Sequence, residues 1–249
     1  MLRMCKYLAL LLLTAVVAVG QTAPPKAPAP QQKAAPRKVP GAQNGAEVPR
    51  TPEAIVNFLI PDNVAYTERL SQVPTPQAIA ALKQAQKDAT GARANAIGFL
   101  LVVLDSDADA NLTHLLNSLQ KCTTDPENCD EAAIPYLGNL FERGDKSVAE
   151  PLLAAATNAE GTVAESLGGT YGDMIAHDPL AFITAVSRRP AKDRRKLCMM
   201  VASGGDGGGL PDDTSAEVQA ALEKLTQESG AISTAAKLCL DEIKKVGKF

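Results

Sequence analysis

The sequence predicts an all-α fold, built either from stacked helical hairpins or as an irregular helical bundle. Apolar residues recur at helical spacing, and no run alternates with period two for long enough to indicate a sheet. Several helix starts are marked by a capping oxygen before a proline at the first helical position. These starts are Thr51-Pro52, Thr75-Pro76, Asp125-Pro126 and Asp178-Pro179. We therefore expect a helical domain over residues 51–249.

The most apolar segment of this domain is Ala94–Leu104, which predicts a central buried helix. A buried strand across Phe99–Leu104 is the alternative, which the flanking helical patterns disfavour. A later helix is expected to begin at the capping box Thr214–Glu217. The expected buried stripe of the central helix is Ile97, Leu100, Leu101 and Leu104.

Similar helical units recur along the middle of the chain. Asp109, Asp145 and Asp178 are interpreted as equivalent helix starts, each followed by apolar residues three and seven positions later. The starts recur at a spacing of roughly 35 residues, which is that of a stacked helical-hairpin array. Because one unit cannot bury its apolar face alone, neighbouring units are expected to stack.

The amino-acid pattern of these units resembles that of the HEAT-like α-solenoid repeats over roughly residues 105–190. The pieces that carry the resemblance are Val163–Gly168, then Gly172-Asp173 with His177–Ala181, and a poorer copy at Gly144–Ala149. The arginine usual in the second helix of that family has no clear counterpart here, and the spacing drifts. The resemblance implies a short α-solenoid with an extended surface for a protein or peptide partner, and a non-repetitive bundle stays open.

The first 20 residues read as a secretory signal peptide. A basic start, Met1–Lys6, precedes the apolar run Tyr7–Val19, and small residues at 18 and 20 predict cleavage before Gln21. The run is shorter than the roughly 20 residues that a helix needs to span a bilayer. An uncleaved anchor is the alternative. We expect the mature protein to be secreted or periplasmic.

Residues 21–50 read as a disordered, basic linker. The stretch 22–50 holds seven prolines and seven alanines and lacks apolar periodicity, so it cannot bury enough surface to offset its ordering entropy. We interpret it as a spacer, with a basic tether to anionic lipid or cell-wall polymer as the alternative. Its net charge of +4 comes from Lys26, Lys33, Arg37, Lys38 and Arg50, opposed by Glu47.

The charge of the expected helical domain restricts its partners. Residues 51–249 carry 18 basic and 27 acidic side chains, a net charge of −9. This balance argues against nucleic acid as a partner, because phosphate neutralisation needs clustered cations. Tryptophan is absent from the chain and other aromatic residues are scarce, which also disfavours large stacking platforms.

Four cysteines follow the signal segment, and an even number in an exported chain predicts two disulfides. Cys122 and Cys129 flank a short inter-helix loop, so we expect them to pair. Cys198 and Cys239, each on a late helix, then form the second pair. Zinc is the alternative, although the cysteine spacing is not that of a zinc knuckle and no histidine lies close in sequence.

Several stretches could be mistaken for a metal or catalytic site. Asp105, Asp107 and Asp109 open like a calcium loop, but alanine and leucine occupy the positions that need glycine and glutamate. Helix capping and interaction with the helix dipole are the preferred interpretation. His114 and His177 are expected to be structural, since no carboxylate lies at ligand spacing from them in sequence. We expect no catalytic, cofactor-binding or metal-binding residues and no cofactor.

Two glycine-rich stretches carry weaker signals. Residues 203–209 are expected to form a mobile connector, with a lid over a groove as the alternative. Gly168 and Gly172 lie four residues apart on an expected helix, which allows another helix to approach closely. Asn111-Leu112-Thr113 matches the glycosylation sequon, which matters only in a eukaryotic host.

One basic cluster is a candidate anion patch. Its members crowd nine positions around Pro190 and are opposed only by Asp193. The alternative is a solvated helix end whose cations complement the C-terminal dipole of the preceding helix. The cluster consists of Arg188, Arg189, Lys192, Arg194, Arg195 and Lys196.

The function expected from the sequence is that of an exported, non-catalytic helical-repeat scaffold, which binds a protein or peptide partner in the periplasm or cell envelope. An exported hydrolase with a site assembled from scattered residues is the alternative, and a structural envelope component is a third. A concave pocket where titratable groups converge would favour the enzyme. Membrane or cell-wall contact is expected only through the basic tail.

Overall fold

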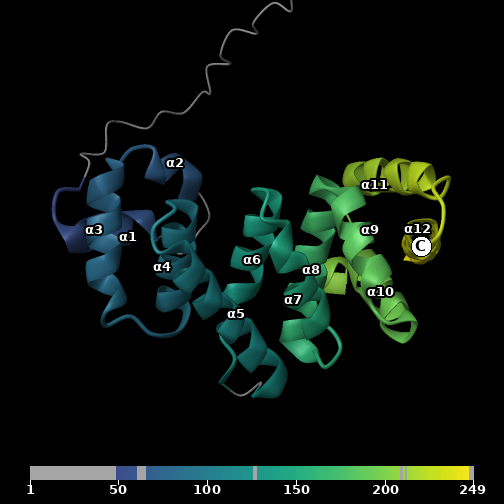
Figure 1. Cartoon of the computed structure of the whole chain (residues 1–249), viewed down its shortest axis with the longest axis horizontal. Coiled ribbons are helices and arrows are strands. Elements are labelled where there is room, and N and C mark those ends of the chain that lie inside the picture. Colours follow the sequence, from purple (N-terminus) through teal and green to yellow (C-terminus); the bar gives the residue numbers. More distant parts are fainter. Residues whose placement is uncertain (1–48, 61–65, 126–127, 208–209, 211, 247–249) are drawn as a thin grey trace, which may run out of the picture. The chain divides into compact units, whose positions relative to one another are not determined.

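The structure is a computed structural model that describes residues 49–60, 66–125, 128–207, 210 and 212–246. The predicted signal peptide and all but the end of the predicted linker lie outside these residues. Within the described residues the chain is helical and contains no strand, which confirms the all-α prediction (Figure 1). The elements are α1 (Pro52–Leu59), α2 (Tyr66–Leu70), α3 (Thr75–Gln86), α4 (Gly91–Val103), α5 (Ala108–Thr124), α6 (Ala133–Glu142), η2 (Lys146–Val148), α7 (Ala149–Ala155), α8 (Gly161–His177), α9 (Pro179–Arg188), α10 (Ala191–Gly207), α11 (Asp212–Leu225) and α12 (Ala231–Val246).

Each helix packs mainly on helices close to it in sequence. The strongest of these pairings join α1 with α3, α4 with α5, α6 with α8, α8 with α10, α10 with α12, and α11 with α12. Such local pairing is what stacked hairpins require. It also occurs in an irregular bundle, so the repeat type stays a prediction.

The predicted central helix is confirmed as α4, and the strand alternative is wrong. Every residue from Ala94 to Leu101 is buried, and Leu104 is partly buried just beyond the helix end. Asn95 is the polar exception in this core. Its side-chain nitrogen donates to Asp130 Oδ2 at 2.9 Å, and its side-chain oxygen accepts from Ser118 Oγ at 2.9 Å. Both ends of the buried amide therefore have a hydrogen-bond partner.

Three of the predicted helix starts are right. Thr51 Oγ1 accepts from the Ala54 amide, and Asp178 Oδ1 accepts from the Ala181 amide at 3.0 Å. Asp145 likewise caps η2, a single 3₁₀ turn that leads directly into α7. These three starts have the same physical cause. A short side chain carries an oxygen that accepts from a backbone N–H of the first turn, which has no partner within the helix.

The other predicted starts differ from the structure in their caps or by a few residues. Helix α3 begins at Thr75 as predicted but without a side-chain cap, and α11 begins at Asp212, two residues before the predicted capping box. The start predicted at Asp125-Pro126 would lie on residues 126 and 127, outside the described part of the chain. The start predicted at Asp109 lies one residue inside α5, which begins at Ala108.

Helix α5 begins at Ala108 because the preceding backbone turns through the left-handed region. Asp105 and Asp107 have φ angles of 53° and 49°, and Asp107 makes no side-chain cap but pairs with Lys83 at 2.8 Å. The capping interpretation is therefore wrong for Asp107, whereas Asp109 lies in the first turn of α5, where a carboxylate complements the helix dipole. The buried stripe consequently follows Asn111, Leu115, Leu119 and Cys122, while the predicted Leu112 and Leu116 are only partly buried.

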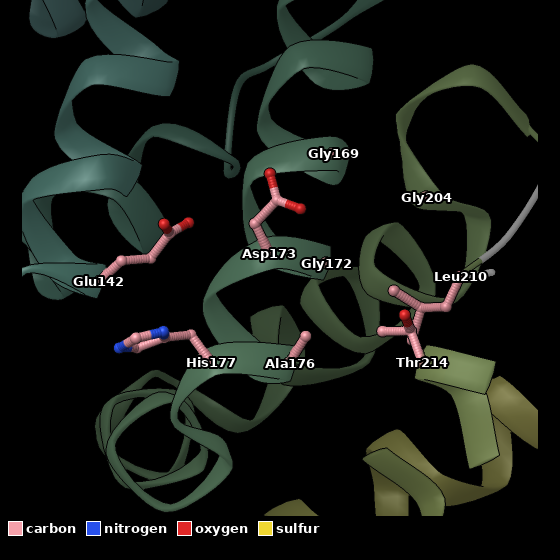
Figure 2. Close-up of a pocket in the computed structure, with 9 residues that line it drawn as sticks. All are labelled: Glu142, Gly169, Gly172, Asp173, Ala176, His177, Gly204, Leu210 and Thr214. Carbon is pink, nitrogen blue, oxygen red and sulfur yellow. The ribbon is translucent and has the colours of Figure 1, made fainter. Parts of the chain in front are cut away.

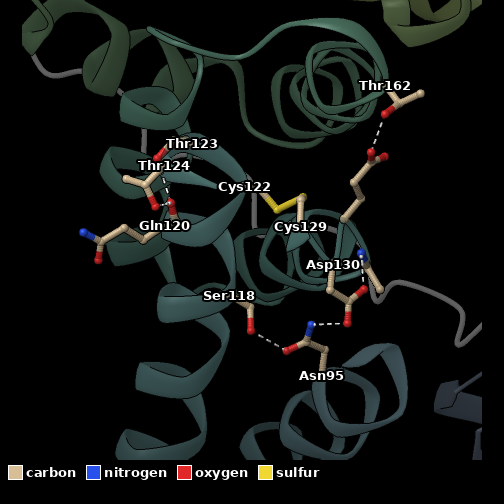
Figure 3. The surroundings of a disulfide bond; sticks show 11 residues. Asn95, Ser118, Gln120, Cys122, Thr123, Thr124, Cys129, Asp130 and Thr162 are labelled. Atoms are coloured by element: carbon tan, nitrogen blue, oxygen red, sulfur yellow. Dashed lines mark hydrogen bonds between the residues drawn. A yellow bond between two sulfur atoms is a disulfide. The ribbon is translucent and has the colours of Figure 1, made fainter. Parts of the chain in front are cut away.

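Both predicted disulfides are found in the structure. Cys122 at the end of α5 pairs with Cys129 across the short loop, with their Cα atoms 4.4 Å apart (Figure 3). Cys198 on α10 pairs with Cys239 on α12, with a Cα separation of 4.5 Å. Cys198 and Cys239 are fully buried, so this second bond crosses the interior between two packed helices.

Residues 203–207 of the predicted connector are helical, and Gly208 and Gly209 lie outside the described residues. Helix α10 continues to Gly207, although Gly204 takes a φ of 54°, which favours glycine. The link from α10 to α11 is therefore shorter than expected. Leu210, within this link, is partly buried and packs against the core.

Candidate functional site

Two adjoining cavities lie along the seam between α6 and α8, with volumes of about 490 and 530 Å³. Both are lined by Glu142, the last residue of α6, and by Asp173 on α8. His177 ends α8 and lines the first cavity, together with Leu210 and Thr214 (Figure 2). We call the two cavities together the α6–α8 groove.

A close approach of the two helices forms this groove. Gly138 on α6 faces Thr170 on α8, and a Cβ atom at Gly138 would overlap the Thr170 methyl group. Glycine therefore permits the helix separation that the structure shows. The sequence predicted a close approach at Gly168 and Gly172 of α8. The close approach to α6 occurs on the same helix but at Thr170, opposite Gly138.

One buried aromatic residue fixes α8 from its other side. Tyr171 is fully buried, and its hydroxyl donates to the Leu152 carbonyl of α7 at 2.6 Å. Its ring also lies 5.9 Å from that of Phe182, on α9. Because Tyr171 packs inward, the residues two and six positions later, Asp173 and His177, are exposed on the groove side of α8.

The electrostatics of the groove favour a cation or a proton. Burial raises the pKa of Glu142, and the nearby charge of Asp173 raises it further, against the opposing effects of His177 and Lys146. Burial also raises the pKa of Asp173. Within the described residues neither carboxylate forms an ion pair. Neither carboxyl group is therefore paired directly with a cation in the described part of the chain, although His177 and Lys146 partly offset the effects on Glu142.

The lysine closest in sequence to these carboxylates is engaged elsewhere. Lys146 Nζ lies 3.0 Å from Asp178 Oδ2, donates to the Phe141 carbonyl at 3.0 Å, and sits 3.8 Å from the centre of the Phe141 ring. This lysine ties the η2 turn to α6 and to the cap of α9. The pKa of Asp178 is lowered, because its hydrogen bonds from Ala181 and Lys146 and the charge of Lys146 outweigh its burial.

The far wall of the groove comes from the link between α10 and α11. A Cβ atom at Gly172 would lie 3.0 Å from Leu210 Cδ2, so Leu210 rests closely on α8. The glycine-rich stretch was a candidate lid in the sequence. The structure places Gly204 and Leu210 in the lining of the first cavity, and the lid interpretation stays a prediction.

Sequence reasoning missed this site. The helical spacing of Asp173 and His177, four residues apart, puts both on one face of α8, a pairing that was not predicted. Nothing local signals Glu142, because it reaches the site only through the packing of α6 on α8. His114 lies apart from this site, with its Cδ2 atom beside Gly98 of α4.

Within the part of the chain that the structure describes, no three metal-ligating side chains converge on one point. The aspartates at 105, 107 and 109 accordingly do not form a cluster of that kind. The sequon residue Asn111 is buried, donates to the carbonyls of Ser106 and Asp107, and accepts from Gln86 at 2.5 Å. A glycan on this amide is incompatible with the folded domain.

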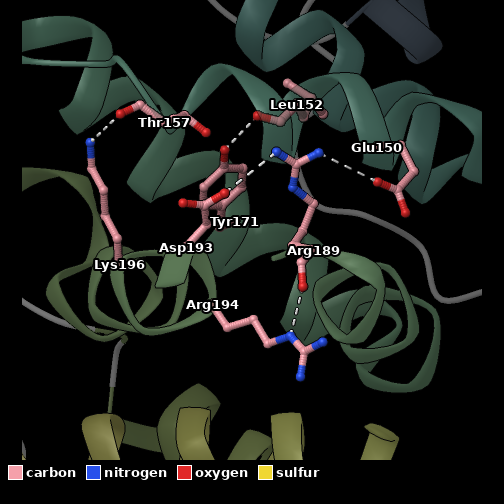
Figure 4. Close-up of polar contacts among 8 residues, drawn as sticks. All are labelled: Glu150, Leu152, Thr157, Tyr171, Arg189, Asp193, Arg194 and Lys196. Carbon is pink, nitrogen blue, oxygen red and sulfur yellow. Dashed lines mark hydrogen bonds and ion pairs between the residues drawn. The ribbon is translucent and has the colours of Figure 1, made fainter. Parts of the chain in front are cut away.

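The candidate anion patch lies at the corner between α9 and α10, and much of it is engaged within the chain (Figure 4). Arg189 lies 3.9 Å from both Glu150 and Asp193. Arg194 Nε donates to the Arg189 carbonyl at 2.8 Å, and Lys196 Nζ donates to two carbonyls of the α7–α8 loop. These contacts support the alternative interpretation, a stabilised helix junction, for that part of the cluster.

The other members of the cluster point away from the core. Arg195 Nε lies 3.1 Å from Glu242 Oε1 on α12, yet its side chain is 66% exposed. Arg188 and Lys192 are exposed. Lys245 also contacts Glu242, at 2.8 Å, and its hydrogen bond is the main reason that the pKa of Glu242 is lowered despite burial.

Comparison with known proteins finds no matching family model, no similar curated protein and no similar solved structure. The resemblance to HEAT-like repeats therefore stays a prediction. Among the described helices, none combines the length and the apolar character needed to cross a membrane.

Proposed function

We propose that this chain is an exported, non-catalytic helical scaffold whose α6–α8 groove binds a protein or peptide partner in the periplasm or cell envelope. The groove carries this proposal, because it is a concave surface, in an otherwise helical, core-packed domain, with carboxyl groups that pair directly with no cation in the described part of the chain. Concave sites with a few convergent polar groups are the usual location of ligand binding. The residues of the seam suit a peptide segment that carries a lysine or arginine side chain.

The chemistry of the groove supports a cationic partner. Placing an ammonium or guanidinium group between Glu142 and Asp173 would relieve the unfavourable burial and mutual repulsion that raise the pKa of Glu142. The second cavity adds a half-buried aromatic residue, Tyr136, and a small residue, Ala132, which suit the apolar stem of a long side chain. Backbone and side-chain amides of a peptide can meet Asn139, which lines the same cavity.

Export belongs to the same proposal. Two disulfides fit an oxidising, extracellular compartment. Residues 1–20 are the proposed signal peptide, cleaved before Gln21, and residues 21–50 the proposed spacer that holds the domain away from the site of export. Sequencing the N-terminus of the protein from expressing cells tests this part, and retention of Met1 on cytosolic protein would contradict it.

The binding proposal is tested with a panel of short fluorescent peptides of equal length that differ only in the number of lysine and arginine residues. We expect the mature wild-type domain to bind the basic members, and the double variant E142Q/D173N to bind them at least about tenfold more weakly. The matched control is D88N/E217Q, which removes one aspartate and one glutamate that are exposed elsewhere. Equal losses in both variants, or no binding by the wild type, would refute the proposed site.

An exported hydrolase is the second candidate, and one observation favours it. Two carboxyl groups with raised pKa values share a cavity with a histidine, which is a common arrangement for general acid–base catalysis. Hydrolysis of a panel of ester, peptide and glycoside substrates distinguishes the candidates. Turnover that is abolished in both E142Q and D173N, and unchanged in D88N/E217Q, would establish the enzyme.

A further inference from the structure

A cationic face on α10 is left unexplained by the fold and by the proposed function. Lys192, Arg195, Lys196 and Met199 lie on one side of the helix, since their spacings of three, four and seven residues return to the same face. Arg188 ends α9, four residues before Lys192. We call these five residues the α10 basic face.

Helix stability does not account for these cations. Arg188 lies at the C-terminus of α9, where a cation complements the helix dipole, but Lys192, Arg195 and Lys196 lie in the first two turns of α10, where it does not. Lys196 donates to two carbonyls of the α7–α8 loop, so the fold accounts for part of its role. The contacts of the other cations leave them largely exposed. Arg195 keeps a 66% exposed side chain beside Glu242, and Lys192 is exposed.

Two acidic residues near this face are largely buried. Asp193 is directed at Arg189, with 16% of its side chain exposed, and only 8% of the Glu242 side chain is exposed. Glu160, next to the Ala159 carbonyl that Lys196 contacts, is exposed at the edge. The exposed cations of the face outnumber the exposed carboxylates beside them, although the domain as a whole carries a net negative charge. Such a local reversal of charge indicates an anionic partner.

An exposed apolar side chain lies among these cations. Met199 is 51% exposed, one of the few large hydrophobic residues of the described chain that face solvent. The flexible thioether of Met199 is flanked by lysine and arginine side chains. This combination suits a lipid surface, where the cations meet anionic head groups and the thioether enters the apolar layer beneath them. An acidic peptide would satisfy the cations but offers no such layer.

The position of the face along α10 supports a planar partner. Lys192 lies at the start of α10, whereas Gly204 lines the acidic groove near the C-terminal end of the same helix. At about 1.5 Å per residue, Lys192 lies about 18 Å from Gly204 along the helix, and Met199, the nearest member of the face, about 7.5 Å. A negatively charged plane would attract the basic end and repel the acidic end, so it would orient the groove away from itself.

We propose that the α10 basic face docks on an anionic phospholipid surface, which holds the domain with its groove directed outward. The docking does not depend on what the groove binds. If the basic linker acts as the tether that is the alternative to a spacer, it would add to the attraction without fixing the orientation.

The experiment measures co-sedimentation of the mature chain with vesicles of phosphatidylglycerol and phosphatidylcholine, and with vesicles of phosphatidylcholine alone. Each cation near an anionic surface strengthens partitioning about fivefold. We expect R188E/K192E to bind the phosphatidylglycerol vesicles at least about 25-fold more weakly than the wild type. The matched control K87E/K121E has the same change in net charge at exposed lysines of the α3–α4 loop and α5, and should stay within about twofold.

A second pair of variants tests the apolar contribution. M199S should weaken binding about threefold, whereas L180S, at a position that is 53% exposed at the start of α9, should have no effect. Equal losses in R188E/K192E and K87E/K121E would overturn the proposal, because attraction would then be nonspecific. Failure to bind phosphatidylglycerol vesicles, or binding of a poly-glutamate peptide in their place, would overturn it as well.

Discussion

Removing the Cys198–Cys239 disulfide should destabilise the domain more than removing Cys122–Cys129. A disulfide restricts the unfolded chain by an amount that grows with the logarithm of the loop it closes. The sequence separations are 41 and 7 residues. The chain-entropy relation then gives about 4 kcal/mol for the first bond and about 2.5 kcal/mol for the second.

Burial adds to this difference. Cys198 and Cys239 are fully buried, so replacing both with alanine also removes two sulfur atoms from the core between α10 and α12. Cys129 is only partly buried, and its loss is better tolerated. We therefore expect C198A/C239A to lose at least about 4 kcal/mol of unfolding free energy.

Urea unfolding of C198A/C239A, C122A/C129A and the wild type, followed by far-ultraviolet circular dichroism, measures these free energies. In thermal unfolding, a domain of this size should show a midpoint lower by at least about 12 °C in C198A/C239A and by about 8 °C in C122A/C129A. Limited proteolysis should release α12 first from C198A/C239A, since that helix loses its covalent link to the body. A C122A/C129A variant that is equally or more destabilised would refute the reasoning.

Three further predictions concern the core and its charges. Y171F should lose about 1–2 kcal/mol in urea unfolding, because a buried carbonyl of α7 loses its donor. G138A should destabilise by about 1–2 kcal/mol through overlap with Thr170, whereas G169A, which meets no atom, should stabilise by about 0.5–1 kcal/mol. The pKa of Glu242 is lower in the folded protein than its value near 4.5 in the unfolded chain, so its charge stabilises the fold above about pH 4.5. This contribution is lost as pH falls through the folded pKa. E242Q should therefore flatten the acid limb of a curve of stability against pH. Unchanged stability in any of these variants would contradict the contact that it tests.

Much of the fold follows from local signals in the sequence. Thr51 and Asp178 cap their helices as predicted, since each signal needs only the residues of one turn. The burial of α4 and both disulfide pairings were also predictable, from the apolar run and from the number and positions of the cysteines in the expected helices.

The errors arise where tertiary contacts override local preference. Asp107 looked like a helix cap but adopts a left-handed conformation, in a turn that the buried Asn111 holds through two backbone carbonyls. That role depends on the packing of α5 on α4, which no sequence pattern shows. For the same reason, Leu112 and Leu116 lie at the edge of the buried stripe of α5, partly buried against the core, and not at its centre.

The candidate site was only half visible in the sequence. Asp173 and His177 share a face of α8 by helical spacing alone. Glu142 is distant from both in the sequence and joins them only because Gly138 allows α6 to approach Thr170. The raised pKa values follow from that packing, so no reading of the sequence could supply them.

Hydrogen–deuterium exchange of the mature domain, with and without a saturating basic peptide that it binds, tests the central claim most directly. If the α6–α8 groove is the binding site, amides of residues 135–142 and 169–177 should gain protection, and E142Q/D173N should abolish that gain. The α10 basic face should be unaffected. Protection confined to the α10 basic face, or to the helices before α6, would contradict the account.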